Sequence, residues 1–304
     1  MSGGDRATFI AGDDYHLGDL LWLTAVIAEY RMQRRPAEVQ VSVPDRDVSR
    51  ILENNPEIDT VDYGCHHSPR WSVGRRDPHA AIHDLRPMSL AVGMVRQWRR
   101  RAPWLYYRDL WLEPRGQWLA TYLGLGRMHS YKPRLTLSED DFRSARQFSG
   151  PYVVLAPHIG SYSLPLTGRL WRKLKGWEDG KWVELASRLR SMGLETLTLG
   201  GRDQTAVAGT VPVLGIPIRQ AAGVISQAAA VVSGESGLWF VAAALDVPFV
   251  IVPWWLPRAV DWPAEMGARS RLVRKSEASV ERVLGAMEDL RARPDMSEPR
   301  AVTA

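Results

Sequence analysis

The sequence predicts an α/β protein built from two parallel-sheet domains, and three observations support that prediction. Apolar runs typical of strands alternate with amphipathic helical stretches from residue 8 onward, a pattern typical of a parallel sheet covered by helices on both faces. The same alternation starts again after the turn-forming sequence Ser149-Gly150-Pro151. The chain of 304 residues is also about twice as long as a domain of roughly 150 residues. We therefore expect an N-terminal domain over residues 1–149 and a C-terminal domain over residues 150–304.

The N-terminal domain is predicted to begin as strand, loop and helix. Thr8–Ala11 is a short apolar run, and the polar loop Gly12–Gly18 separates it from the apolar stretch Leu20–Tyr30. A helix is expected over residues 45–52, because Pro44 and acidic residues precede it and Asn54-Asn55-Pro56 ends it. Another helix is expected over residues 87–101. The remaining predicted strands are Val39–Val43, Ile58–Tyr63 and Ala80–Leu85.

The C-terminal domain repeats this alternation with shorter loops. Helices are expected over residues 181–192, 220–227 and 237–245, with a last one near residues 277–293. Gly193 follows the first of them at the position where a chain commonly leaves a helix in the left-handed conformation. The last helix can pack either on its own domain or back on the N-terminal one. The predicted strands are Tyr152–Ala156, Leu194–Leu199, Val211–Ile216, Ala229–Ser233 and Pro248–Val252.

Composition excludes several classes of protein. Hydrophobic residues make up 45% of the chain and charged residues 24%, which is incompatible with a disordered protein. The single cysteine, Cys65, excludes a disulfide framework and a multi-cysteine zinc site. The N-terminus has no basic leader, and no apolar stretch approaches the roughly 18 residues of a membrane span. We therefore expect a cytoplasmic protein.

The net charge of +5 is concentrated in one region. Residues 86–115 contain seven arginines against Asp109 and Glu113, so this region alone has an excess of five positive charges. A solvated helix end that includes Arg99, Arg100 and Arg101 explains the cluster; an anion-binding or membrane-facing patch is the alternative. Because 34 of the 39 basic residues are arginine, codon bias explains the excess, and we expect no nucleic-acid partner. Tryptophans in or just beyond the region suit core packing or stacking on a sugar: Trp98, Trp104, Trp111 and Trp118.

Asp19 is the first candidate for chemistry. In open parallel sheets ligands bind beyond the carboxyl ends of strands, so the loop after the first predicted strand faces the expected ligand site. Gly18 lets the backbone approach a ligand closely, and the carboxylate of Asp19 could take a proton from a hydroxyl group. Asp19 is equally suited to capping the following helix. The residues alone leave both roles open.

Two further loops suggest phosphate binding. The sequence from Ser233 to Leu238 places small residues between a strand and a helix, where backbone N–H groups and the hydroxyl of Ser236 could bind a diphosphate. A plain strand-to-helix turn is the alternative. Lys175, one of only five lysines, precedes a helix and could neutralise phosphate.

Metal binding is the weaker interpretation of two other sequences. Asp45-Arg46-Asp47 has the D-x-D pattern that holds a metal in one class of transferase, but it also stands where a helix start favours acidic groups. The adjacent residues Cys65-His66-His67 are poorly placed to share one metal. We expect no metal site.

Five short motifs occur in order along the chain. They are Gly18-Asp19-Leu20-Leu21 with Thr24, Val43-Pro44 with Leu52–Asp59, Lys175–Trp182, Leu199–Asp203, and Glu235-Ser236-Gly237-Leu238 with Ala242–Leu245. Together they resemble the heptosyltransferase family of bacterial glycosyltransferases, glycosyltransferase family 9. The resemblance covers most of residues 8–255.

The resemblance implies the GT-B fold, with two Rossmann-like domains facing across a cleft, the acceptor on the N-terminal domain and the donor on the C-terminal one. It implies an inverting, metal-independent glycosyltransferase that needs no cofactor. The expected partners are a nucleotide diphosphate sugar, with ADP-heptose as the expected donor, and a saccharide or small-molecule acceptor. The alternative interpretation of the basic region over residues 86–115 adds a peripheral contact with the inner face of the membrane.

The resemblance also assigns residues to roles. Asp19 is the expected catalytic base, and Gly18 with Arg99, Arg100 and Arg101 lies on the acceptor side. The expected donor-binding residues are Lys175, Gly200, Gly201, Gln204, Glu235, Ser236, Gly237 and Leu238.

The chain departs from the family pattern at several of these positions. Phe240 replaces a histidine, Glu235 replaces an aspartate, and Gln204 replaces the acidic residue that faces the donor ribose. The sequence Ala156-Pro157-His158 replaces the usual H-P-G. These changes leave two alternatives open: the same fold acting on a natural-product or cell-wall acceptor with another nucleotide sugar, or a catalytically silent family member.

Overall fold

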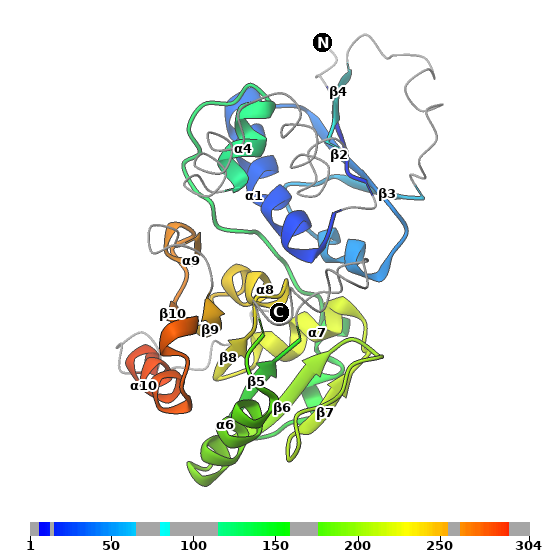
Figure 1. Cartoon of the computed structure of the whole chain (residues 1–304). Helices are drawn as coiled ribbons and strands as arrows, with labels where there is room; N and C mark the ends of the chain where they lie inside the picture. The colour runs from blue at the N-terminus through cyan, green and yellow to red at the C-terminus, as the bar shows by residue number, and fades with distance from the viewer. Residues whose placement is uncertain are drawn as a thin grey trace. The chain divides into compact units, whose positions relative to one another are not determined.

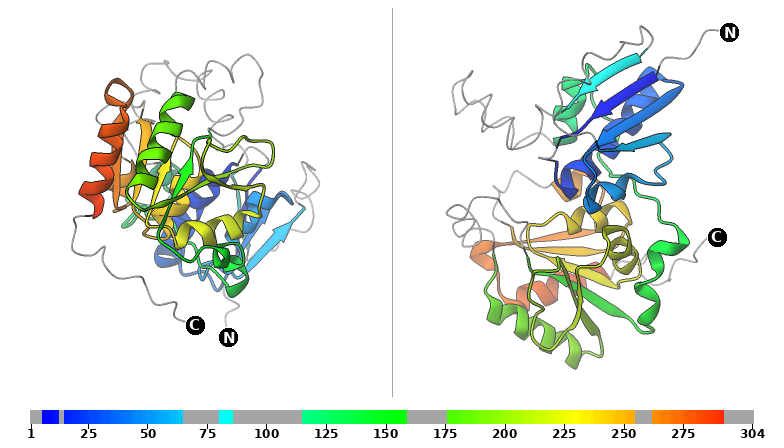
Figure 2. Two further views of the ribbon diagram at one scale, coloured as in Figure 1. Left: turned by 90° about the horizontal axis from the view of Figure 1, so that it is seen from below. Right: turned by 90° about the vertical axis from the view of Figure 1, so that its right-hand side faces the viewer.

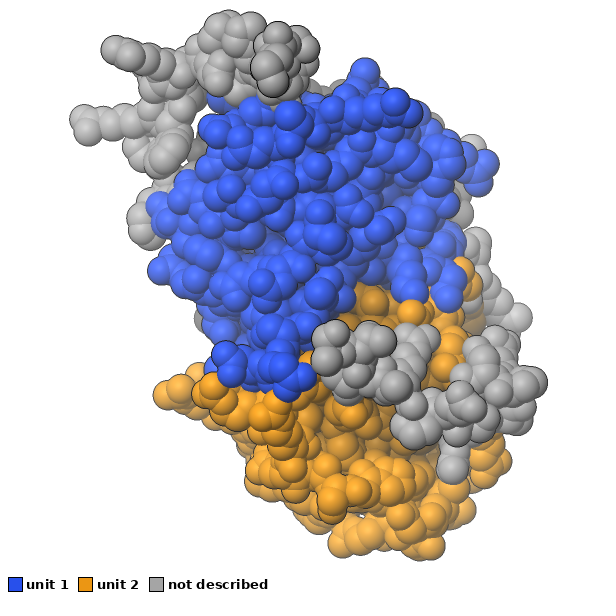
Figure 3. All heavy atoms as spheres, turned by 180° about the vertical axis from the view of Figure 1, so that it is seen from behind, with its two compact units in different colours: residues 1–141, 217–219, 265–267 blue, residues 142–216, 220–264, 268–304 orange. Residues whose placement is uncertain are grey.

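The computed structural model describes residues 6–12, 15–64, 80–85, 115–158, 176–254 and 262–291 (Figure 1). The chain divides into two compact units, coloured separately in Figure 3. Unit 1 comprises Met1–Asp141 together with Pro217–Arg219 and Glu265–Gly267, and unit 2 comprises the rest. This division falls at residues 141/142, whereas the sequence analysis expects a domain boundary at residues 149/150.

Unit 1 contains a parallel sheet of four strands. The strands are β1 (Arg6–Ile10), β2 (Glu38–Val43), β3 (Thr60–Tyr63) and β4 (Ala80–Asp84), in the spatial order β3-β2-β1-β4. Since the strands are parallel, their carboxyl ends share one edge of the sheet. β2 and β3 lie on one side of β1, and β4 lies on the other side. The strand order therefore reverses between β1 and β4, which is the position where such sheets bind ligands.

Helix α1 (Leu17–Arg34) covers the buried face of this sheet, and α4 (Arg115–Tyr122) packs beside α1. The ring of Tyr30 on α1 meets the ring of Phe9 on β1 edge to face, with 5.1 Å between ring centroids. Gly116 on α4 lies so close to the fully buried Trp22 of α1 that an added Cβ would be 3.1 Å from the indole. The core of unit 1 therefore depends on α1, which buries every residue from Asp19 to Ile27.

Unit 2 contains a parallel sheet of six strands with the order β7-β6-β5-β8-β9-β10. This is the 3-2-1-4-5-6 order of a Rossmann fold, with its topological switch point between β5 and β8. The strands are β5 (Tyr152–Ala156), β6 (Glu195–Gly200), β7 (Val211–Leu214), β8 (Ala230–Ser233), β9 (Phe249–Trp254) and β10 (Ser270–Arg274).

Helices cover both faces of the sheet of unit 2 (Figure 2). On one face, Val153 and Leu155 point into a core formed with α6 (Asp179–Ser191) and α10 (Val280–Arg291). On the other face, the Tyr152 hydroxyl donates to Val224 O of α7 (Ile218–Ser226) at 2.7 Å, and Phe249 stacks on Trp239 of α8 (Leu238–Ala244). The expectation of a parallel sheet buried on both faces is confirmed. The last helix, α10, packs on β9, β10 and α6 of its own unit.

Several elements differ from the sequence-based expectation. The helix expected over residues 45–52 is the 3₁₀ helix η1 (Asp47–Leu52). The sequence does not predict strand β10 or helices α4 and α9 (Trp262–Glu265). It also does not predict three single-turn segments: η4 (Glu139–Phe142), η5 (Ala145–Gln147) and η6 (Lys275–Glu277). Gly193 does end α6 with a φ of +79°. The helix expected over residues 87–101 lies outside the described residues. Within the described part of the chain, no helix combines the length and apolarity needed to cross a bilayer.

Candidate active site

The candidate base, Asp19, stands in the first turn of α1. The helix begins at Leu17, so Gly18 is a helical residue and not part of the preceding loop. The Asp19 side chain is buried, and its Oδ2 accepts a hydrogen bond from the backbone N–H of His16 at 2.9 Å. This contact is the capping role that the sequence offered as an alternative.

The loop before Asp19 is held by residues that follow two other strands. The hydroxyl of the buried Tyr15 donates to Leu85 O, just after β4, at 2.9 Å. The backbone carbonyl of Tyr15 accepts from Arg46 Nη2, beyond β2, at 2.6 Å. Tyr15 is thus fixed against the residues that follow β4 and β2, at the edge of the sheet where a ligand would bind.

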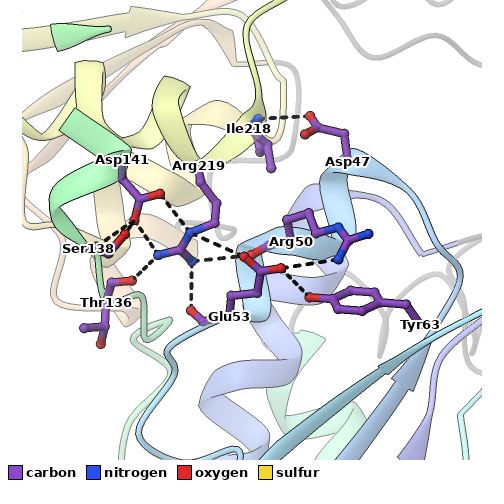
Figure 4. A network of polar contacts seen from close by, with 9 residues as sticks. All are labelled: Asp47, Arg50, Glu53, Tyr63, Thr136, Ser138, Asp141, Ile218 and Arg219. Carbon is purple, nitrogen blue, oxygen red and sulfur yellow. Dashed lines mark hydrogen bonds and ion pairs between the residues drawn. The ribbon is translucent and has the colours of Figure 1, made fainter. Parts of the chain in front are cut away.

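The D-x-D carboxylates have protein partners. Asp45 forms an ion pair with Arg50 on the surface of unit 1. Asp47 Oδ2 accepts from the backbone N–H of Ile218, the first residue of α7, at 2.9 Å (Figure 4). Asp47 therefore caps a helix far along the chain in addition to beginning η1. Among the residues that the structure describes, no group of three or more His, Cys, Asp or Glu side chains is arranged to hold a metal.

The motif from Leu52 to Asp59 is structural in this chain. Asn55 is buried; its amide donates to Arg134 O at 3.0 Å, and its Oδ1 accepts from Glu57 N at 3.0 Å. Asp59 Oδ2 accepts from Val39 N at 2.6 Å and pairs with Arg31. These bonds join the turn after η1 to β2 and to the segment near residue 134, so none of them requires a ligand.

Unit 1 also contains a buried arginine from the second half of the sequence (Figure 4). Arg219 Nε donates to Asp141 Oδ1 at 3.0 Å, and Nη2 donates to Asp141 Oδ2 at 2.5 Å. The same guanidinium donates to the carbonyls of Glu53 and Thr136, both at 2.8 Å. The pKa of Asp141 is lowered, because hydrogen bonds from Arg219 and Ser138 outweigh burial, which alone would raise it.

In unit 2, the loops after β5 and β8 meet at the switch point. Gly234 N donates to Ala156 O at 2.9 Å, and a Cβ on Gly234 would lie 3.3 Å from Pro157 O. Glycine at position 234 therefore lets the two loops approach each other. The Rossmann topology places the expected nucleotide site here, beyond the carboxyl ends of β5 and β8.

The turn after β6 is compact and closed by Gln204. Gln204 Oε1 accepts from Gly201 N at 2.7 Å, and a Cβ on Gly200 would collide with the same oxygen. The ring of His158, which follows β5, packs over Gly200, and its Nε2 hydrogen-bonds to Thr205 O at 2.8 Å. The predicted donor-binding residues of this turn thus lie together, with His158 added. The sequence signal for His158 was its position just after a buried strand.

The loop after β8 is organised mainly by Ser236. Its hydroxyl lies 3.0 Å from that of the buried Ser233 and accepts from Leu238 N at 3.3 Å. Glu235 and Gly237 belong to the same loop, with Gly237 as the N-cap of α8. Because α8 has only seven residues, its dipole is too weak a basis for an anion site. Any phosphate contact here depends on the loop itself.

Three motif positions are core residues. Trp177 and Trp182, from the Lys175–Trp182 motif, meet edge to face at 5.0 Å and belong to the core of unit 2. Trp177 Nε1 also donates to Ala278 O at 3.1 Å. Phe240, where the family has a histidine, is buried on α8 beside Trp239. The remaining predicted residues lie outside the described part of the chain: Lys175, Arg99, Arg100, Arg101, Cys65, His66 and His67.

Residues 117–252 match the sequence model of glycosyltransferase family 9 (heptosyltransferase). This range contains the loops of Gly200 and Ser236 and ends on β9. These residues are similar to a family 9 glycosyltransferase domain. The resemblance drawn from the motifs, and with it the enzyme class, is therefore confirmed.

Solved structures agree with the family 9 assignment at the level of the fold. A family 9 glycosyltransferase from Veillonella parvula superimposes with a TM-score of 0.67 at 16% identity, covering 94% of this chain and 97% of that one. The ADP-heptose lipopolysaccharide heptosyltransferase II of E. coli superimposes with a TM-score of 0.64 at 18% identity, covering 93% of this chain and 98% of that one. E. coli heptosyltransferase WaaC with ADP superimposes with a TM-score of 0.57 at 15% identity, covering 93% of this chain and 99% of that one. No curated protein sequence matches the chain. The predicted fold class, two Rossmann-like sheets of the GT-B kind, is confirmed.

Proposed function

We propose that this family 9 domain transfers a sugar, with inversion and without a metal, from a nucleotide diphosphate sugar to a hydroxyl acceptor. ADP-heptose is the donor we propose first. The match of residues 117–252 to the family carries the proposal. The six-stranded sheet supports it, because its switch point is where such folds bind a nucleotide.

The chemistry that we propose is a single displacement. The acceptor oxygen forms a bond to the anomeric carbon while the bond from that carbon to the diphosphate oxygen breaks, so the nucleoside diphosphate leaves with the electron pair. Asp19 takes the proton of the acceptor hydroxyl. The buried cap on His16 N fixes the Asp19 carboxylate in one orientation, as a base needs.

The donor is proposed to bind the loops of unit 2. Backbone N–H groups of the Ser233–Leu238 loop and the charge of Lys175 would stabilise the leaving diphosphate. The turn of Gly200, Gly201 and Gln204 would contact the nucleoside, with His158 beside it. Metal independence is supported by the partners of the D-x-D motif, since Arg50 and Ile218 N already engage its carboxylates.

Binding and turnover together test this function. Thermal shift and calorimetry against ADP-, UDP-, GDP- and dTDP-sugars identify the base, and donor hydrolysis shows whether the protein cleaves the donor. We expect ADP-sugars to raise the melting temperature of the protein. We also expect the protein to release ADP slowly from the donor in the presence of EDTA. Preference for another base would replace the heptose donor by a different nucleotide sugar. Binding without any cleavage would instead indicate a silent member, an alternative suggested by the buried Phe240.

The acceptor side is proposed to include Arg99, Arg100 and Arg101, either toward an anionic acceptor or at the inner face of the membrane. Neutralising all three to glutamine tests this. Weaker binding to vesicles with anionic lipid, at unchanged nucleotide binding, would favour the membrane contact. Unchanged acceptor and vesicle binding would return the cluster to a solvated helix end.

A further inference from the structure

Arg46 holds the loop that precedes the proposed base. Its Nη2 donates to the backbone carbonyl of Tyr15 at 2.6 Å, the short distance typical of a charge-assisted hydrogen bond. The Tyr15 hydroxyl donates to Leu85 O at 2.9 Å, and the Tyr15 side chain is only 1% exposed. Tyr15 is therefore fixed at its carbonyl by the residues after β2 and at its hydroxyl by the residues after β4.

The next residue transmits this position to Asp19. The backbone N–H of His16 shares a peptide unit with the Tyr15 carbonyl that Arg46 binds. The same N–H donates to Asp19 Oδ2 at 2.9 Å. Because a peptide unit is planar, fixing the carbonyl oxygen on one side also fixes the direction of the N–H on the other. Arg46, Tyr15, His16 and Asp19 thus form one continuous path to the Asp19 carboxylate.

We propose that Arg46 is a positioning residue for Asp19, so that the functional member of the Asp45-Arg46-Asp47 motif is its arginine. This inference rests on the proposed function, since it assigns Arg46 a part in the same transfer. A misplaced base lowers the rate of the chemical step, whereas the loops of unit 2 that bind the nucleotide remain intact. Loss of the Arg46 bond should therefore lower kcat and leave nucleotide affinity unchanged.

The motif itself provides a matched control. Asp45 is adjacent to Arg46, but its carboxylate is exposed, and among the described residues its ion-pair partner is the partly exposed Arg50. Such exposed ion pairs contribute little to stability. A metal-binding D-x-D motif would require Asp45 for activity, while the positioning role of Arg46 does not. Asp45→Asn consequently separates the two interpretations.

The test compares Arg46→Met, Arg46→Lys and Asp45→Asn in the full chain. Arg46→Met keeps the length of the side chain without a donor, and we expect kcat to fall about tenfold to hundredfold with nucleotide KM unchanged. Arg46→Lys restores one donor and should recover part of the loss. Asp45→Asn should behave as wild type. Hydrogen exchange of the His16 amide, which needs no activity, should accelerate in Arg46→Met and not in Asp45→Asn.

The outcomes distinguish failure of this inference from failure of the proposed function. If wild type transfers sugar and Arg46→Met retains its kcat and His16 protection, the positioning role is wrong while the function stands. If wild type shows no transfer, the function fails, and exchange at His16 still decides whether Arg46 holds the loop. Should Arg46→Met not fold, Arg46→Lys provides the same readouts with smaller expected changes. Equal losses of kcat and of nucleotide binding would also overturn the inference.

Discussion

Arg219 and Asp141 form a buried, two-bond ion pair inside unit 1, although 78 positions separate them in the chain. Their side chains are 8% and 6% exposed. The guanidinium also donates to the carbonyls of Glu53 and Thr136, so one side chain joins the end of η1 to the segment that leads to η4. Unit 1 is therefore completed by residues 217–219 and is not formed by the N-terminal residues alone.

Removing the carboxylate of this pair should destabilise the protein strongly. Asp141→Ala leaves the cation of Arg219 buried without its partner, and we expect a loss of about 3–5 kcal/mol in the free energy of unfolding. Urea unfolding of the full chain measures it. Arg282→Ala is the control, because Arg282 is 67% exposed and its ion pair with Glu277 spans 4.0 Å. A double variant, Asp141→Ala with Arg219→Ala, should lose less than the sum of the single losses.

The same pair predicts a pH dependence on the acid side. Because the folded-state pKa of Asp141 lies below its ordinary value, the carboxylate stabilises the fold at pH values above about 4, the unfolded pKa. That contribution disappears as the pH falls through the folded pKa. The difference in unfolding free energy between wild type and Asp141→Asn should therefore be constant from pH 7 to about 5 and shrink below about 4.

The comparison with Asp141→Asn is needed because a second buried carboxylate responds in the same direction. The pKa of Glu29 is also lowered, since hydrogen bonds from His129 and Gln33 outweigh its burial. Both proteins contain Glu29, so its contribution cancels in the difference. A difference that grows on acidification would contradict the assigned sign.

Asp19→Asn should separate catalysis from capping. The amide oxygen of asparagine can still accept from His16 N, so helix α1 keeps its cap. The amide cannot take a proton from the acceptor, and we expect kcat to fall by about 10²- to 10⁴-fold. Calorimetry should show unchanged binding of the nucleoside diphosphate. Retained turnover would leave Asp19 with the cap alone.

The sequence predicted the strands well for a physical reason. Buried parallel strands are nearly continuous apolar runs, and β5, from Tyr152 to Ala156, is buried at every position. The sequence did not predict strand β10, because Ser270–Arg274 has only two apolar residues, Leu272 and Val273. As the last strand of the described sheet, it has a neighbour on one side only and needs fewer apolar contacts.

The candidate site was harder to predict, because its contacts join distant parts of the chain. The D-x-D pattern draws attention to two carboxylates, yet the bond that bears on Asp19 comes from the arginine between them. Lys175 was expected to bind phosphate, whereas Trp177 and Trp182 of the same motif fill the core. Local sequence specifies which residues are apolar or polar, but not which distant carbonyl a guanidinium will reach.

Gly200 provides the last test, on the turn proposed to contact the nucleoside. A Cβ there would collide with Gln204 Oε1 and lie 3.2 Å from the His158 ring. In Gly200→Ala the end of the Gln204 side chain must move and lose its bond to Gly201 N, at about 1 kcal/mol of stability. Gly201→Ala is the control for stability, because its Cβ would lie 3.7 Å from Gln204.

For binding, we expect Gly200→Ala to weaken nucleotide affinity about tenfold, as a displaced Gln204 and His158 change the surface beyond β6. Gln204→Ala reports the contribution of the amide without the added methyl group. If Gly200→Ala loses stability while its nucleotide affinity and that of Gln204→Ala stay at the wild-type value, the turn is only structural. The nucleoside would then bind elsewhere on the carboxyl edge, nearer the loops of Pro157 and Gly234, where the sheet has its switch point.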